Sequence, residues 1–143
     1  MQTFLPYSSF VDSAGILDYK RLGKQRVEVK QLLLALGKPV GEHLPKPTNS
    51  GWTNHPAVRM WRGYEAGLAL YGIAICKEWR ASGYNDTLLP QFEAIANYAK
   101  IVLPPWLGMP EFHQAHQSNL KRKDPVFYAH FNVPNNLEYI WPC

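Results

Sequence analysis

The residues best suited to chemistry lie between positions 18 and 30, where one carboxylate, Glu28, stands among cations. The cations of this stretch are Lys20, Arg21, Lys24, Arg26 and Lys30. In a helix, Arg21, Gln25 and Glu28 share one face because they are four and three residues apart. A single acid on a basic face is what an enzyme acting on a nucleic-acid backbone needs. The alternative is a solvated helix in which Lys24 pairs with Glu28, and the pattern favours neither.

A second group of charges follows Asn54-His55-Pro56, a sequence typical of a helix start with Asn54 as the cap. Arg59, Arg62 and Glu65 then recur at intervals of three residues. This spacing is compatible with a stripe that faces phosphates. The pattern alone favours the solvent-facing side of a helix.

A third group combines two histidines, His113 and His116, with the basic run Lys121-Arg122-Lys123. Histidines three residues apart could bind zinc, but no Cys-x-x-Cys pair accompanies them, so we predict neither a metal nor a cofactor. Hydrogen bonding to phosphates suits His116, Asn119 and the three cations better.

The elements that must position these residues are helices, because no strand pattern longer than a few residues occurs. Long helices are expected at residues 19–36, 56–82, 90–99 and 110–123. Short ones are expected from Asp12 or Ser13 to Leu17 and again from Asp124. Residues 1–7 read as an extended arm, residues 38–54 as a loop, and residues 139–142 as an aromatic tail. The prediction is an all-α fold, a compact packing of three or four helices.

Length and composition indicate a single domain over residues 1–143, with one hydrophobic core. The net charge of +4 favours a polyanionic partner, and we predict no obligate protein partner. Cys76 lies in an apolar run and is expected to be a reduced core residue. No apolar window reaches the length of a membrane span, and the N-terminus lacks a signal segment. These features predict a soluble, cytoplasmic protein without membrane contact.

Nearly the whole chain resembles a known family. The resemblance rests on the opening Met1 to Pro6 and on four motifs: LDYKRLGKQRVE, NHPAVRMWRGYEAGLALYG, CKEWRASGY and HQSNLKRKDP. These stretches resemble bacterial and phage members of the pyrimidine dimer DNA glycosylases, the endonuclease V-like family.

The resemblance implies a DNA repair glycosylase with AP-lyase activity on pyrimidine dimers or another altered base. Such enzymes attack the sugar C1′ with a free N-terminal α-amine, form a Schiff base and break the strand by β-elimination. An α-amine with an ordinary pKa of about 8 is partly neutral at physiological pH. Gln2 is too large for efficient removal of the initiator, so the amine would be that of Met1. The catalytic residues implied are Met1, Glu28 and Arg21.

The implied partner is double-stranded DNA, whose backbone is clamped by basic side chains while a base is extruded from the duplex. The candidate DNA contacts are Lys20, Lys24, Arg26, His55, Arg59, Arg62, His116, Asn119, Lys121, Arg122, Lys123 and Trp141. Two other functions stay open. One is a DNA-binding module without glycosylase activity. The other is a hydrolase or transferase that acts on a nucleotide-like ligand through the same basic face and Glu28.

Overall fold

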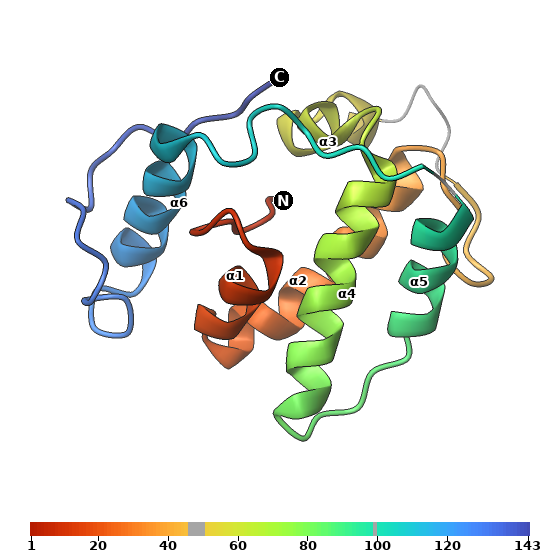
Figure 1. The fold of residues 1–143 in the computed structure, drawn as a ribbon, viewed down its shortest axis with the longest axis horizontal. Coiled ribbons are helices and arrows are strands. Elements are labelled where there is room, and N and C mark those ends of the chain that lie inside the picture. Colours follow the sequence, from red (N-terminus) through yellow and green to blue (C-terminus); the bar gives the residue numbers. More distant parts are fainter. Residues whose placement is uncertain (46–50, 99) are drawn as a thin grey trace.

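The computed structural model describes residues 1–45, 51–98 and 100–143, and within them it contains helices and no β-strand. The helices are α1 (Phe10–Ile16), α2 (Tyr19–Ala35), the 3-10 helix η1 (Gly51–Asn54), α3 (Pro56–Trp61), α4 (Glu65–Ala81), α5 (Leu89–Tyr98) and α6 (Pro110–Lys123) (Figure 1). The predicted all-α fold is confirmed, with more helices than the expected three or four. Residues 46–50 of the expected loop and Ala99 of the expected third helix lie outside the described residues.

Both ends of α2 lie where the sequence predicts them. The Asp18 side chain caps the first turn by accepting from the Arg21 N–H at 3.4 Å. After Leu36, Gly37 adopts a φ of 88°, which glycine reaches without the steric cost that other residues meet. The helix therefore presents the predicted face that carries Gln25 and Glu28.

The single helix expected over residues 56–82 is wrong, because two helices, α3 and α4, occupy this stretch. The break lies at Gly63, whose φ of 88° leaves the helical region. The apolar spacing continues across the break and therefore concealed it. The cap also differs: the His55 Nδ1 accepts from the Ala57 N–H at 3.0 Å, so the cap is His55 and not Asn54.

Two short segments also differ from expectation. α1 begins at Phe10 and is capped by Ser9, whose Oγ accepts from the Asp12 N–H at 3.1 Å, so neither Asp12 nor Ser13 is the cap. After α6, residues 125–130 form turns instead of the expected short helix.

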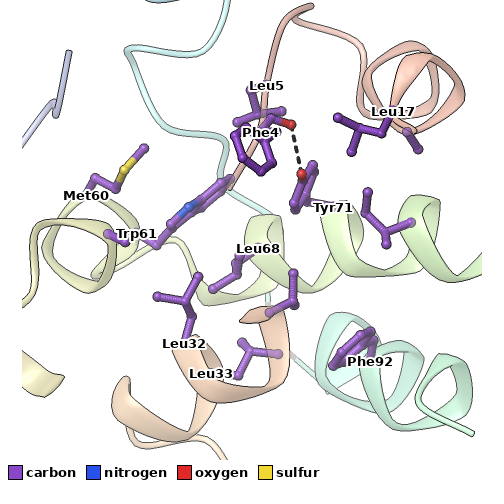
Figure 2. Close-up of a cluster of buried hydrophobic side chains, with 14 of the residues drawn as sticks. Phe4, Leu5, Leu17, Leu32, Leu33, Met60, Trp61, Leu68, Tyr71 and Phe92 are labelled. Carbon is purple, nitrogen blue, oxygen red and sulfur yellow. Dashed lines mark hydrogen bonds between the residues drawn. The ribbon is translucent and has the colours of Figure 1, made fainter. Parts of the chain in front are cut away.

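α4 lies at the centre of the fold and packs against α1, α2 and α5. A Cβ at Gly72 would lie 2.7 Å from the Phe92 ring and 2.8 Å from Val29, so only glycine allows α2 and α5 to approach α4 this closely. Figure 2 shows Trp61, Tyr71 and Phe92 in this core. Cys76 is buried and free, as predicted.

The N-terminal arm, residues 1–7, forms no helix or strand and bends at Pro6 and Tyr7, and it is also part of the core. Figure 1 shows it between α6 and the layer formed by α2 and α4. Phe4 and Leu5 are both buried (Figure 2). The arm thus joins α6 to the rest of the fold.

Candidate active site

The buried part of the arm, residues 3–6, has no helical hydrogen bonds, so its backbone groups need partners from elsewhere. Side chains of α2, α4 and α6 supply them. Phe4 N–H donates to Gln25 Oε1 (3.0 Å), Leu5 N–H donates to His116 Nδ1 (3.0 Å), and the carbonyls of Phe4 and Pro6 accept from Tyr71 Oη (2.8 Å) and Gln117 Nε2 (2.8 Å). The start of the chain is therefore fixed by residues that are distant in sequence.

Gln25 connects the arm to the carboxylate. Its Nε2 donates to the carbonyl of Gln2 at 3.0 Å and to Glu28 Oε2 at 2.7 Å. Its Oε1 accepts from the Phe4 N–H and from Tyr71 Oη. One amide group thus holds the second residue of the chain and Glu28 side by side.

Glu28 lies at the edge of an open cavity of about 260 Å³. The cavity is lined by Gln2, Phe4, Lys20, Arg21, Lys24, Glu28 and Lys123. Lys24 Nζ lies 3.9 Å from Glu28 Oε1, and its side chain is 75% exposed, so this ion pair is weak. Arg21 is held toward the cavity by Asp18 at 3.1 Å. The cavity therefore combines a carboxylate with four cations, a charge pattern suited to a substrate that carries phosphates.

Aromatic residues of the C-terminal tail surround the same region. The Tyr139 ring packs on His116 and Trp141, with centroids 4.8 Å and 4.6 Å apart, and Trp141 contacts His55 at 5.9 Å. Burial and the negative charge of Glu28 raise the pKa of Tyr139. Burial and the positive N-terminal amine lower the pKa of His55. The amine of Met1 and the carboxylate of Glu28 thus act on neighbouring members of one aromatic cluster.

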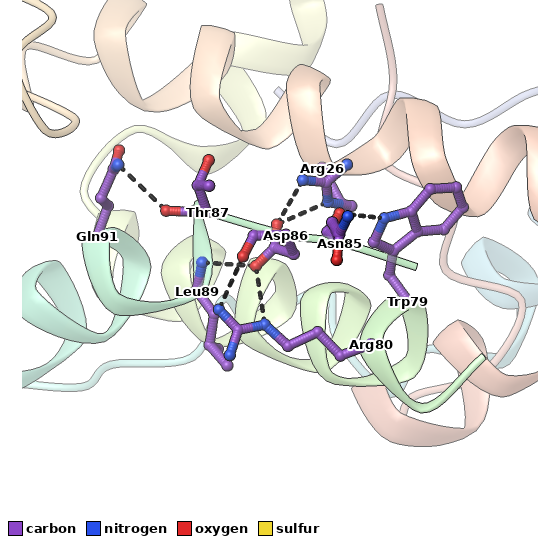
Figure 3. A network of polar contacts seen from close by, with 8 residues as sticks. All are labelled: Arg26, Trp79, Arg80, Asn85, Asp86, Thr87, Leu89 and Gln91. Carbon is purple, nitrogen blue, oxygen red and sulfur yellow. Dashed lines mark hydrogen bonds and ion pairs between the residues drawn. The ribbon is translucent and has the colours of Figure 1, made fainter. Parts of the chain in front are cut away.

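Several predicted DNA contacts hold the protein together. Arg26 lies away from the cavity, donates from Nε to Asp86 Oδ1 at 2.7 Å and stacks over Trp79 (Figure 3). Lys121 Nζ donates to the carbonyls of Phe131 and Val133 at 2.9 Å and 3.0 Å. Both cations are therefore bound within the protein, Arg26 to a carboxylate and Lys121 to two carbonyl oxygens.

The polar α6 residues lie inside the fold. His116 is completely buried, and this burial lowers the pKa of its ring to about 3. Asn119 is also buried, and its Nδ2 donates to the Gln2 side chain at 3.2 Å. Both residues contact the arm, His116 at Leu5 and Asn119 at Gln2.

The remaining predicted contacts lie near the surface. Arg122 is exposed and donates to Asn119 Oδ1 at 3.1 Å and to the carbonyl of Asn135 at 3.2 Å. Arg59 is exposed on α3, and Arg62 donates to the carbonyl of Thr53 at 2.7 Å. These arginines keep part of their charge available to solvent.

Sequence reasoning did not assign a role to Gln25 or Tyr71. Gln25 falls on the predicted face between Arg21 and Glu28. Its neutral amide between two charged residues is the sequence feature that could have indicated its role. Tyr71 was assigned to the core by its spacing, and its ring is buried, but its hydroxyl serves the arm. Nothing in the local sequence indicates that partner.

Within residues 1–45, 51–98 and 100–143, no three His, Cys, Asp or Glu side chains gather as metal ligands would. Over the same stretches, no helix has the length and apolar character needed to span a membrane.

Fold and site together define an all-helical protein that buries its N-terminal arm beside a carboxylate and a basic cavity. The sequence model of one family, pyrimidine dimer DNA glycosylase, matches residues 1–90, and the chain belongs to this family. The matched stretch contains the arm and Glu28, whereas α6 lies beyond it. Comparisons with curated proteins and with solved structures give no match. At the level of the family, the match supports a DNA repair glycosylase and implies that the protein binds DNA.

Proposed function

We propose that this protein is an endonuclease V-like glycosylase with AP-lyase activity, and that its nucleophile is the α-amine of Met1. Its substrate is double-stranded DNA that contains a pyrimidine dimer or another altered base. The protein acts as one domain over residues 1–143, which is supported by a core that joins Phe4 to Phe131.

The reaction proceeds in two stages. The neutral amine attacks C1′ of the damaged nucleotide, the glycosidic bond breaks, and its electron pair leaves with the base, which takes up a proton. The nitrogen gives up a proton, the C1′–O4′ bond breaks with its electron pair and a proton going to O4′, and a protonated Schiff base forms between C1′ and the nitrogen. Loss of a proton from C2′ then expels the 3′ phosphate by β-elimination. Glu28 stabilises the positive charge on the sugar and transfers protons during both stages.

One observation carries the proposal: the Gln25 amide binds the backbone of Gln2 and the Glu28 carboxylate at the same time. A nucleophile at residue 1 has to be held beside its acid, because correct placement of reacting groups supplies a large part of catalysis. The buried arm meets this requirement. A flexible terminus would not.

The DNA backbone is bound by the cations that line the cavity. Lys20, Lys24 and Lys123 surround Glu28, and Arg21 acts directly beside it on the phosphates of the damaged nucleotide. His55, Arg59, Arg62 and Arg122 extend the contact along the duplex, and Trp141 stacks against the extruded base or its neighbour.

Borohydride trapping tests the proposal, because borohydride reduces a Schiff base to a stable amine. Duplex DNA with an abasic site or a thymine dimer is the substrate, undamaged duplex is the control, and intact-mass analysis first establishes whether Met1 is the terminal residue. We expect a covalent adduct that maps to residue 1 and disappears when the α-amine is acetylated. DNA binding without an adduct would contradict the lyase mechanism and favour the binding module. Absence of both would favour a small phosphorylated ligand.

A further inference from the structure

Two histidines of α6 enclose one residue of the arm. His113 and His116 lie one helical turn apart and are 6% and 0% exposed. His113 Nδ1 lies 2.8 Å from the carbonyl oxygen of Leu5, and the N–H of Leu5 donates to His116 Nδ1 at 3.0 Å. Both backbone groups of Leu5 are therefore bound by the two imidazoles. We call this pair the histidine clasp.

The hydrogen bonds fix the protons of both rings. The N–H of Gly108 donates to His113 Nε2 at 2.8 Å, so the proton of that ring is on Nδ1 and is donated to Leu5. His116 accepts from Leu5 through Nδ1, so its own proton is on Nε2. The clasp requires two neutral rings in opposite tautomers. The low pKa of His116 agrees with a ring that stays neutral.

Ring packing fixes the orientation of His116. Its centroid lies 4.3 Å from that of Phe112 and 4.8 Å from that of Tyr139. The plane of the ring is thus held between Phe112 and Tyr139, and the hydrogen bond from the Leu5 N–H selects the orientation in which Nδ1 faces the arm.

We infer that His113 and His116 are positioning residues that place the N-terminal amine beside Glu28 by fixing the backbone of Leu5. This inference rests on the proposed function. Gln25 binds the arm at Gln2 and Phe4 from the α2 side, whereas the clasp binds it at Leu5 through α6. With both sides bound, the arm that carries the amine is held in a fixed position relative to Glu28. A misplacement of about 1 Å can cost about 100-fold in rate, which is the size of effect that such a clasp would prevent.

The test compares His116→Leu, which removes the acceptor, with His116→Asn, whose Oδ1 replaces Nδ1. His130→Leu is the control, because His130 is exposed and outside the site. For each protein we would measure hydrogen exchange of the Leu5 amide, the single-turnover trapping rate with borohydride, and the affinity for the same DNA. The rate at which the Met1 amine reacts with a small aldehyde in the absence of DNA is a fourth measurement.

In His116→Leu we expect Leu5 to lose protection, the aldehyde to react faster, and trapping to slow by about 10- to 100-fold, the range expected for a misplaced nucleophile. DNA affinity should change less than about twofold, because the ring is buried away from the phosphates. His116→Asn should recover most of the rate, and His130→Leu should match the wild type. If His116 served folding alone, His116→Leu would lower trapping and DNA affinity together, and His116→Asn would not restore the trapping rate.

The outcomes separate the clasp from the lyase mechanism. Unchanged Leu5 exchange in His116→Leu overturns the clasp, and a released arm with unchanged trapping overturns its positioning role. If the wild-type protein forms no adduct, the proposed function fails, and the rates of reaction with the aldehyde test the clasp separately. A faster reaction in His116→Leu alone supports the clasp, and equal rates in all proteins overturn it. If His116→Leu does not fold, nitrogen NMR of wild-type histidines decides. The expected result is a proton on Nδ1 of His113 and on Nε2 of His116, and any other tautomers overturn the clasp.

Discussion

Residues of α2 bind two carboxylates: Arg26 binds Asp86, and Gln25 binds Glu28. The two carboxylates differ in how completely they are paired. The side chain of Asp86 is fully buried and accepts from Arg26 Nε at 2.7 Å, the Leu89 N–H at 2.9 Å and Arg80 Nε at 3.4 Å (Figure 3). Glu28 is hydrogen-bonded to Gln25 and has a cation 3.9 Å away, at the edge of an open cavity. Arg26 and Glu28 are two residues apart on the same helix and serve different purposes.

The two carboxylates differ in whether their negative charge is available to a substrate. Burial by itself raises the pKa of Asp86, but the hydrogen bonds from Leu89 and Arg26 outweigh it and hold the pKa below its usual value. That carboxylate is stabilised as an anion and has no remaining site for a substrate. Glu28 is fixed in place by Gln25 and keeps one face toward the cavity, so a positive charge that develops on a sugar can reach it.

The largest effect on activity is expected from Glu28→Gln, which removes the charge of the carboxylate at the cavity. We expect borohydride trapping to fall by about 10² to 10⁴-fold, because the amide cannot stabilise a cation or transfer protons. The variant should keep the hydrogen bond from Gln25, so its free energy of unfolding in urea and its DNA affinity should stay close to the wild-type values. Full trapping activity would remove Glu28 from the mechanism.

Asp86→Ala should show the opposite pattern. It leaves Arg26 largely buried without its carboxylate, which costs about 3–5 kcal/mol of unfolding free energy. The trapping rate per folded molecule should stay unchanged, because Arg26 does not line the cavity. Urea denaturation and active-site titration measure the two quantities. A loss of stability below about 1 kcal/mol would show that this network is not a structural ion pair.

Acid should separate the two regions. The pKa of His116 is about 3 in the folded protein, below its ordinary value of 6.5. As the pH falls, the ring therefore takes up a proton first in molecules whose arm has been released. Its stabilisation is complete above pH 6.5 and declines toward pH 3 by about 1.4 kcal/mol per pH unit. The lowered pKa of Asp86 gives a stabilisation that is lost only below its ordinary value of 3.8.

Hydrogen exchange corrected for intrinsic rates measures this difference. Between about pH 6.5 and pH 4, protection of the arm should fall before protection of α5, which follows Asp86. In His116→Asn the pH dependence of the arm should be flatter. Parallel loss of protection in both regions would contradict the prediction.

The smallest effect concerns the cations. Lys20→Ala and Lys123→Ala should each lower the slope of log affinity against log salt by about 0.9, because each removes one phosphate contact. Lys121→Ala is the matched control on α6, since its ammonium is bound by two carbonyls. We expect it to lower stability and to leave the salt slope nearly unchanged. An equal change of slope in all three variants would mean that α6 contacts DNA along its whole basic run.

Local signals predicted much of this molecule. The helical face of Glu28 follows from spacing, and the ends of α2 follow from Asp18 and Gly37, whose effects act within one turn. The division into α3 and α4 was missed because the apolar period continues through the break, while the backbone turns at Gly63. Apolar spacing reports which residues are buried and is insensitive to a turn that keeps them buried.

The site depended on contacts that span the chain. Arg26 was grouped with the DNA contacts because its partner, Asp86, lies 60 residues away. His116 was assigned to phosphates because nothing near it in sequence indicates that Leu5, at a separation of 111 residues, occupies its nitrogen. The charge of a residue can be read from the sequence, but its partner depends on the packing of distant helices.

The same separation sets the order of events during synthesis. Leu5 leaves the ribosome long before its hydrogen-bonding partners on α6, which lie 108 and 111 residues further along the chain. α2 and α4 can pair early, whereas closing so long a loop has to wait for residues 110–123. A nascent chain therefore carries its terminal amine without the groups that hold it. The reactive centre is complete only once α6 has packed against the arm, so its assembly reports that the chain between Leu5 and His116 has folded.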